Sequence, residues 1–259
     1  MRAYIGKLIS FAVGQRVLLP KNLARGTEAS DLINRIIDLR GFNGSYLEVG
    51  VENGLTLEAV NIRRRIAVDP YPRFRVTWLT PRIESHKLTS NAFFGQNNKV
   101  FDIIYLDGLH TAEQTLMDLH NALKKLSNNG VIVIDDTIPN DEFSAIPNQD
   151  EAYRLRKKES NSDDTSWHGD VYKVVSIIAS FMKDSLNVAT VTSLKNPKTI
   201  IWKKADNIDI NWELDKYSKK LNEQTYKETF ANGVPPMFNP VSWNQFEELF
   251  LERHKSISE

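Results

Sequence analysis

The sequence has no cysteine, which excludes a disulfide framework, a thiolate zinc site and a cysteine nucleophile. It also has no excess charge, because 33 Lys and Arg residues balance 33 Asp and Glu residues. No basic stripe of the kind that binds nucleic acid is present, and no apolar run reaches the roughly 20 residues of a membrane-spanning helix. We therefore expect a cytoplasmic protein with no nucleic-acid partner and no stable membrane insertion.

The length of 259 residues, 41% of them hydrophobic, suits one α/β domain with additions. We predict a single domain over residues 1–259, with N-terminal helices in 1–40, a core in 41–204 and a C-terminal helical extension in 205–259. In the N-terminal part, an apolar helical face is expected just before Gly41. It is formed by Leu32, Ile33, Ile36, Ile37 and Leu39.

Both terminal segments have an apolar face that a second subunit could cover. At the N-terminus this face predicts an amphipathic helix that packs on the core or on a partner subunit, or lies on a membrane surface; its residues are Ile5, Leu8, Ile9, Ala12 and Val13. Near the C-terminus, Ser242 and Gln245 form a capping-box pattern before a second face, made of Trp243, Phe246, Leu249 and Phe250. A homo-oligomer could form through either segment.

Strand and helix patterns alternate along the core. The expected strands are 45–50, 65–69, 100–107, 130–135, 187–192 and 199–203. "FDIIYLD" and "GVIVIDD" are apolar almost throughout, as in parallel strands buried on both faces. Between them, leucines at helical spacing predict a helix that Asn128, Asn129 and Gly130 end. The pattern predicts a doubly wound, Rossmann-like α/β sheet with helices on both faces.

A long polar segment, residues 139–169, interrupts this alternation. Its sequence "KKESNSDDTSWHG" is the part most typical of disorder. Loops of this length in compact domains are commonly lids or mobile segments. We predict a lid that orders over a bound acceptor.

The stretch "YLEVGVENGLTLEAV", residues 46–60, places an acid and two glycines where a strand turns into a helix. Glycines let the backbone approach a ligand closely, but the Glu48 carboxylate would repel the pyrophosphate of a dinucleotide. Asp69 follows 21 residues later, close to the spacing at which an acid binds ribose hydroxyls. A ligand with a ribose and a cationic end is S-adenosylmethionine. The alternative is a plain strand-to-helix turn with Asp69 as a helix cap.

From about residue 46 to residue 137, the sequence resembles the class I S-adenosylmethionine-dependent methyltransferases, and within them the small-molecule O-methyltransferases of the catechol and macrocin types. The resemblance implies that Glu48, Gly50 and Gly54 line the methionine end of the cofactor. It implies that Asp69 holds the ribose and that Ser90, in "TSNAFF", flanks the adenine. Asp107 is a further candidate contact at the cofactor edge of the sheet.

Two apolar strands end in acids. Asp107 closes one, and Asp135 closes the next with Asp136 beside it. Neighbouring strands lie about 4.8 Å apart, so these carboxylates should gather at one edge and suit a hard cation such as Mg²⁺ or Mn²⁺. Catechol-type methyltransferases have the same arrangement, which implies a metal that activates the acceptor hydroxyl. Alternatively, the acids cap helices or bind the cofactor without a metal.

Two histidines are candidates for the base that takes the hydroxyl proton. His110 follows the strand that ends in Asp107, although it could instead cap the next helix or contact the adenine. His168 ends the polar segment, in "WHGDVYK". The remaining histidines, His86, His120 and His254, fit surface or packing positions.

The function predicted from the sequence is metal-assisted O-methylation of a small molecule, such as a sugar or another polyhydroxylated metabolite. Three other readings remain. A nucleic-acid base methyltransferase would carry an Asn or Asp before Pro-Pro-aromatic where this sequence has "LDGLH". An NAD-dependent dehydrogenase needs a phosphate-cradling turn, which Glu48 opposes. A non-catalytic nucleoside-binding protein of the same fold is the third.

Overall fold

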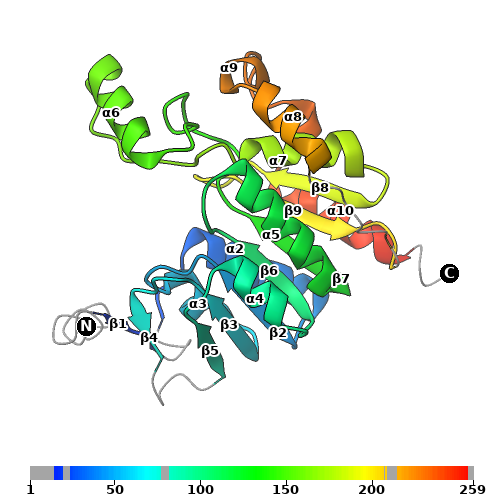
Figure 1. Ribbon diagram of the computed structural model, residues 1–259. Coiled ribbons are helices and arrows are strands. Elements are labelled where there is room, and N and C mark those ends of the chain that lie inside the picture. Colours follow the sequence, from blue (N-terminus) through cyan, green and yellow to red (C-terminus); the bar gives the residue numbers. More distant parts are fainter. Residues whose placement is uncertain (1–14, 20–23, 77–81, 207, 209–214, 256–259) are drawn as a thin grey trace. The chain divides into compact units, whose positions relative to one another are not determined.

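The computed structural model describes residues 15–19, 24–76, 82–206, 208 and 215–255 (Figure 1). The chain divides into two compact units. Unit 1 comprises residues 1–108 and 121–130, and unit 2 comprises residues 109–120 and 131–259. The prediction of a single domain over the whole chain stays a prediction. The N-terminal amphipathic helix expected around Ile5 to Val13 lies outside the described residues.

Unit 1 contains four strands that pair in parallel and lie side by side in Figure 1. In spatial order they are β6 (Phe101–Leu106), β2 (Ser45–Val49), β3 (Arg64–Val68) and β5 (Ile83–His86). The patterns of β2, β3 and β6 were predicted correctly, because each is an apolar run that is buried from solvent. The sequence did not indicate β5, which is short and mostly polar. A separate parallel pair joins β1 (Arg16–Val17) to β4 (Phe74–Arg75).

Three helices belong to unit 1: α2 (Glu28–Arg40), α3 (Leu55–Ala59) and α4 (Ser90–Gln96). A capping box between Thr27 and Ser30 begins α2, and Gly41 ends it in the left-handed conformation, with φ 65°. The predicted apolar face of α2 is confirmed at Leu32, Ile33, Ile36 and Ile37, which are buried, whereas Leu39 is half-buried.

Unit 2 contains a mixed set of strands. In spatial order they are β7 (Leu126–Ile134, whose first five residues belong to unit 1), β9 (Lys198–Lys203), β8 (Leu186–Val191) and β10 (Pro240–Val241). The pairs β7–β9 and β8–β9 are antiparallel, whereas β10 and β8 are parallel. The predicted α/β, Rossmann-like fold class is confirmed. One boundary was wrong: α5 (Ala112–Lys125) ends before Leu126, and Asn128 to Gly130 lie in β7 instead of ending the helix.

Unit 2 contains five further α-helices among the described residues. They are α6 (Gln149–Ser160), α7 (Tyr172–Ile177) with a following π-helical turn, α8 (Asp215–Glu223), α9 (Tyr226–Thr229) and α10 (Trp243–Lys255). The polar segment 139–169 is therefore not one long loop, because α6 occupies its middle. Asn148 starts α6 by accepting a hydrogen bond from the backbone N–H of Glu151 at 2.9 Å.

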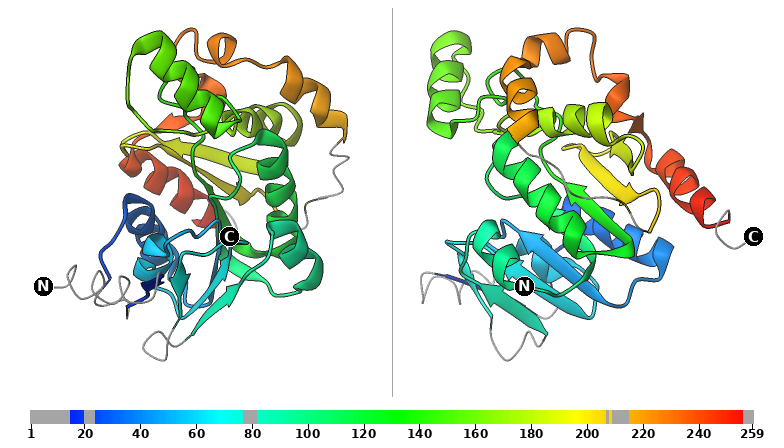
Figure 2. Two further views of the ribbon diagram at one scale, coloured as in Figure 1. Left: turned by 60° about the vertical axis from the view of Figure 1, so that its left-hand side comes forward. Right: turned by 45° about the vertical axis from the view of Figure 1, so that its right-hand side comes forward.

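The last helix of the C-terminal extension, α10, begins with the capping box that the sequence predicts. The Ser242 backbone N–H donates to Gln245 Oε1 at 2.8 Å, and the Gln245 backbone N–H donates to Ser242 Oγ at 3.4 Å. Helix α10 packs on β8 and β10 (Figure 2), and Trp243, Phe246 and Phe250 are buried. Leu249 was expected on the same face but is 40% exposed, so that face is narrower than predicted. Among the described residues, no helix has the length and apolar character to cross a bilayer.

Candidate functional site

Glu48 lies in the interior of unit 1 rather than on its surface. Its side chain is on β2, on the same face as Tyr46, whose hydroxyl donates to Glu48 Oε2 at 2.6 Å. The backbone of Leu57, in α3, also hydrogen-bonds to this carboxyl. Burial raises the pKa of Glu48 well above its usual range, although the bond from Tyr46 lowers it. Glu48 thus connects β2 to α3, and its contact with the cofactor stays a prediction.

The two glycines of the turn leave room for other atoms of the protein, which lie where a side chain would be. Gly50 and Gly54 have φ values of 79° and 73°, which residues other than glycine rarely adopt. A β-carbon on Gly50 would lie 1.8 Å from the carbonyl oxygen of Asp107, and one on Gly54 would lie 2.7 Å from Leu18 Cδ2. The close approach expected at this turn is therefore made by neighbouring protein atoms. A role for either glycine in binding the cofactor stays a prediction.

Asp69 fastens the glycine turn to the end of β3. Its Oδ2 accepts the backbone N–H groups of Val51 at 2.9 Å and Glu52 at 2.8 Å, and its Oδ1 accepts that of Tyr71 at 2.7 Å. The capping alternative is thus realised in part, on a turn rather than on a helix. A carboxylate has about four acceptor sites, so half-buried Asp69 keeps capacity for about one ribose hydroxyl rather than two.

The other two candidate cofactor contacts of unit 1 also follow strands. Ser90 is the first residue of α4, whose N-cap is Thr89. Asp107 comes directly after β6, and the hydroxyl of Tyr105 donates to its Oδ2 at 3.3 Å. Both side chains are half-buried.

In unit 2, Asp135 is surrounded by hydrogen-bond donors. The antiparallel register places Ile134 of β7 opposite Thr199 of β9, which brings the next residue, Asp135, beside Lys198. Asp135 Oδ1 accepts Lys198 Nζ at 2.5 Å, Asn196 Nδ2 at 3.1 Å and the backbone N–H of Asp136 at 2.7 Å. The ammonium group therefore balances the charge of this carboxylate.

Asp136 lies between two histidines. Its Oδ2 is 3.1 Å from Nδ1 of His110, and its Oδ1 is 3.7 Å from Nε2 of His168. Asn196 Nδ2 also donates to Oδ1, at 2.8 Å. Burial and the adjacent charge of Asp135 raise the pKa of Asp136, and the two histidines and Asn196 only partly oppose them. The backbone of Asp136 has a φ of 57°, an uncommon value for a residue other than glycine.

His110 is held by contacts on one nitrogen and on its ring face. Nδ1 lies near two acceptors, Asp136 Oδ2 at 3.1 Å and the carbonyl oxygen of Trp167 at 3.3 Å. The Trp167 ring stacks on the imidazole with 4.7 Å between centroids. Since Nδ1 faces acceptors, it carries the hydrogen in the neutral ring, and Nε2 carries the lone pair that can take a proton.

His168 is more deeply buried, with 4% of its surface exposed. Burial lowers its pKa, although the charge of Asp136 raises it, which keeps the imidazole neutral at pH 7. Among the residues described, its Nδ1 has no hydrogen-bond partner. At the start of α5, Asp170 Oδ1 accepts the backbone N–H of Ala112 at 2.7 Å and Thr111 Oγ1 accepts that of Gln114 at 3.4 Å; a capping role for His110 stays a prediction.

The structure thus groups two of the predicted acids and both predicted histidines within unit 2. Asp107 belongs to unit 1, so its participation in the same site stays a prediction. Sequence reasoning missed Lys198 and Asn196. Asn196 lies in the turn between β8 and β9, and Lys198 is the first residue of β9; both are more than 60 residues from Asp135. Only the strand register, which no local pattern encodes, could have indicated them.

A family model described as a methyltransferase domain matches residues 47–137. Over these residues the chain is similar to methyltransferase domains. The match spans the glycine turn, Asp69, Asp107 and the acids after β7. It confirms the predicted resemblance to the class I S-adenosylmethionine-dependent methyltransferases and the predicted type of enzyme.

Solved structures with a similar course of the chain include three methyltransferases. An O-methyltransferase from Bacillus cereus, in complex with S-adenosylhomocysteine, is 14% identical, with a TM-score of 0.47 over 77% of this chain and 89% of the other. TomG from Streptomyces achromogenes is 13% identical, with a TM-score of 0.45 over 70% and 81%. PaMTH1 from Podospora anserina is 15% identical, with a TM-score of 0.42 over 68% and 77%. No curated protein matches the sequence.

Proposed function

We propose that this protein transfers the methyl group of S-adenosylmethionine to a hydroxyl of a small molecule, a sugar or another polyhydroxylated metabolite. The observation that carries the proposal is the pair of half-buried His110 and buried Asp136 in unit 2. When a carboxylate holds one nitrogen of an imidazole, the other nitrogen can act as a general base.

The cofactor would be held by residues of unit 1. We assign its methionine end to Glu48, Gly50 and Gly54, its ribose to Asp69, and its adenine to the region of Ser90, with Asp107 as a further contact. The remaining acceptor capacity of half-buried Asp69 fits a ribose hydroxyl. When bound, S-adenosylmethionine supplies an electrophilic methyl group on a sulfonium.

The acceptor must lose a proton for its oxygen to attack the methyl carbon. Nε2 of His110 takes that proton, while Nδ1 keeps its hydrogen bond to Asp136. The carboxylate stabilises the imidazolium that forms, and stacking on Trp167 fixes the ring plane. His168 remains the alternative base, although burial lowers its pKa and so its affinity for a proton.

The divalent cation predicted at Asp107, Asp135 and Asp136, Mg²⁺ or Mn²⁺, stays a prediction, and the donors of unit 2 oppose it at Asp135. Asp135 Oδ1 accepts an ammonium group, and both oxygens of Asp136 face nitrogen atoms. A hard cation takes oxygen ligands almost exclusively. Proton removal as described above needs no metal, and no step of the proposed transfer depends on one.

The absence of a nucleic-acid partner, the homo-oligomer and the cytoplasmic location stay predictions. The segment 139–169 contributes Trp167 and His168 beside His110 and Asp136. We therefore propose that this segment contacts the acceptor.

The base assignment can be tested with purified protein, radiolabelled S-adenosylmethionine and a panel of sugars, catechols and other hydroxylated compounds. With an accepted substrate, His110→Ala should lower the rate of transfer by roughly 10²- to 10⁴-fold. Binding of S-adenosylhomocysteine should remain near the wild-type value. His86→Ala, at the half-buried end of β5 in unit 1, is the matched control and should transfer normally. Wild-type rates in His110→Ala would contradict the assignment.

A further inference from the structure

We propose that the ammonium group of Lys198 takes the place of a divalent cation beside Asp135 and Asp136, so that the protein works without a metal at this position. The inference rests on the proposed function and deepens it. It replaces the metal that the acidic strand ends predict with a charge supplied by the chain.

The contacts of Lys198 are those of a built-in cation. Nζ donates to Asp135 Oδ1 at 2.5 Å and to the carbonyl oxygen of Asn196 at 3.1 Å. Two oxygens, one of them charged, therefore surround the ammonium group. Lys198 is 3% exposed and Asp135 is also buried, so water screens this pair little.

Asn196 extends the same arrangement to the second carboxylate. Its Nδ2 donates both to Asp135 Oδ1, at 3.1 Å, and to Asp136 Oδ1, at 2.8 Å. The amide thus donates to both adjacent carboxylates, a bridging role that a shared metal ion would otherwise have. Because Asn196 and Lys198 come from one hairpin, a single element of unit 2 supplies all of these donors.

A metal ion would have to displace these donors. At Asp135 it would compete for Oδ1, which already accepts three N–H groups, and the ammonium group of Lys198 would repel it. On Asp136 it would meet two imidazole nitrogens and an amide, whereas Mg²⁺ prefers oxygen ligands and bound water. Expelling Lys198 would leave a buried ammonium group without its partner, which is strongly unfavourable.

The consequence concerns the acceptor. Chelation by a metal favours substrates with two adjacent oxygens, whereas proton removal by His110 requires one hydroxyl. In this arrangement Lys198 is a positioning residue. It fixes Asp135 and, through Asn196, the orientation of Asp136 behind His110.

The test is a titration of Mn²⁺ into the full-length protein, followed by the electron paramagnetic resonance signal of free Mn²⁺. Wild type should show no site tighter than about 1 mM. Lys198→Met removes the charge from a side chain of similar length, so this variant should gain a Mn²⁺ site. The double variant Lys198→Met, Asp135→Asn should lose that site again. Lys195→Met is the matched control, since Lys195 lies in the same hairpin but is exposed, and it should behave as wild type.

Two results would overturn the proposal. One is a Mn²⁺ site in wild type that Asp135→Asn or Asp136→Asn removes. The other is a folded Lys198→Met variant, verified by circular dichroism, that gains no site. If Lys198→Met does not fold, the wild-type titration decides alone. Thermal stabilisation by S-adenosylhomocysteine, measured on the same samples, reports on the proposed function separately from the metal.

Discussion

Glu48 is a carboxyl group that unit 1 encloses, and its burial has a measurable cost. Burial raises its pKa in the folded state, so the folded protein holds this proton to higher pH than the unfolded chain does. The stabilisation that goes with the proton is complete below the unfolded pKa of about 4.3 and is lost as pH rises through the folded value. A buried acid at this position therefore stabilises the fold less at neutral pH than at acidic pH.

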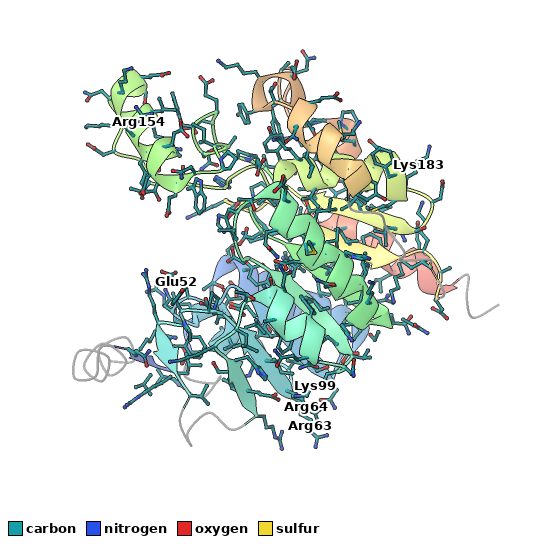
Figure 3. All side chains as sticks on the ribbon, viewed as in Figure 1. Glu52, Arg63, Arg64, Lys99, Arg154 and Lys183 are labelled. Carbon is teal, nitrogen blue, oxygen red and sulfur yellow. The ribbon has the colours of Figure 1, made fainter. Side chains whose placement is uncertain are left out.

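Glu48→Gln should imitate the protonated acid, because its amide can still meet the hydroxyl of Tyr46. We expect the variant to gain stability relative to wild type between about pH 5 and pH 8, by at most about 1.4 kcal/mol per pH unit. Urea unfolding at several pH values measures this. Glu52→Gln is the control, since Glu52 is largely exposed in the turn after β2 (Figure 3). Parallel curves for wild type and Glu48→Gln would contradict the argument.

At the scale of elements, the turn between β2 and α3 depends on Gly50. Its positive φ and its approach to the carbonyl oxygen of Asp107 both exclude a side chain. Gly50→Ala should cost at least about 2 kcal/mol of unfolding free energy, from backbone strain and a clash with the main chain.

Gly95 is the matched control for that substitution. It lies on the exposed surface of α4, with nothing within 4 Å of an added β-carbon. Gly95→Ala should be neutral or stabilise by up to about 1 kcal/mol, since alanine favours helices. Equal unfolding free energies for the two variants would show that the turn relaxes around a side chain.

The polar segment around α6 has an internal framework that its composition does not suggest. Arg156 is buried and donates to the carboxylate of Asp141 through Nε at 3.2 Å and Nη2 at 3.0 Å. It also donates to the carbonyl oxygens of Asp164 at 2.8 Å and Ser166 at 2.9 Å. Burial would raise the pKa of Asp141, but the bonds from Arg156 and Ser144 outweigh it and lower the pKa. One side chain thus connects both ends of the segment to α6.

Arg156→Ala should loosen the segment without unfolding the rest of unit 2. The lost charge-assisted bonds are worth about 2 kcal/mol, so amide hydrogen exchange in residues 139–169 should become roughly 30-fold faster. Arg154→Ala is the control on the same helix, because that side chain is mostly exposed (Figure 3). Unchanged exchange in Arg156→Ala would show that other contacts hold the segment.

For the whole molecule, the decisive property is which nucleoside stabilises the fold. S-adenosylhomocysteine at about 100 times its dissociation constant should add about 2.7 kcal/mol, which corresponds to a rise in melting temperature of roughly 5 to 10 °C for a chain of this size. NAD should have no effect. Asp69→Ala should reduce the shift, because it loses the proposed ribose contact, whereas Asp38→Ala, on the exposed side of α2, should not. Stabilisation by NAD alone would favour the dehydrogenase.

The sequence by itself determined the elements whose signals are local. Apolar runs indicated β2, β3, β6 and the second half of β7, because burial on both faces requires such runs. Ser242 with Gln245 indicated the start of α10, because a cap depends on residues three apart. The acid-glycine turn and Asp69 indicated the similarity to methyltransferases that a family model matches over residues 47–137. These features depend on spacing along the chain, which a sequence displays directly.

Only the tertiary structure decided what these residues contact. Glu48 faces Tyr46 because two residues of one strand share a face of a buried sheet, and Gly50 faces the carbonyl of Asp107 because β2 and β6 are neighbours. Lys198 lies beside Asp135 because β9 pairs with β7 in one register, and a shift of one residue would turn its side chain to the other face. Register is set by packing over the whole sheet rather than by any local pattern, so the partner of each acid was decided only in three dimensions.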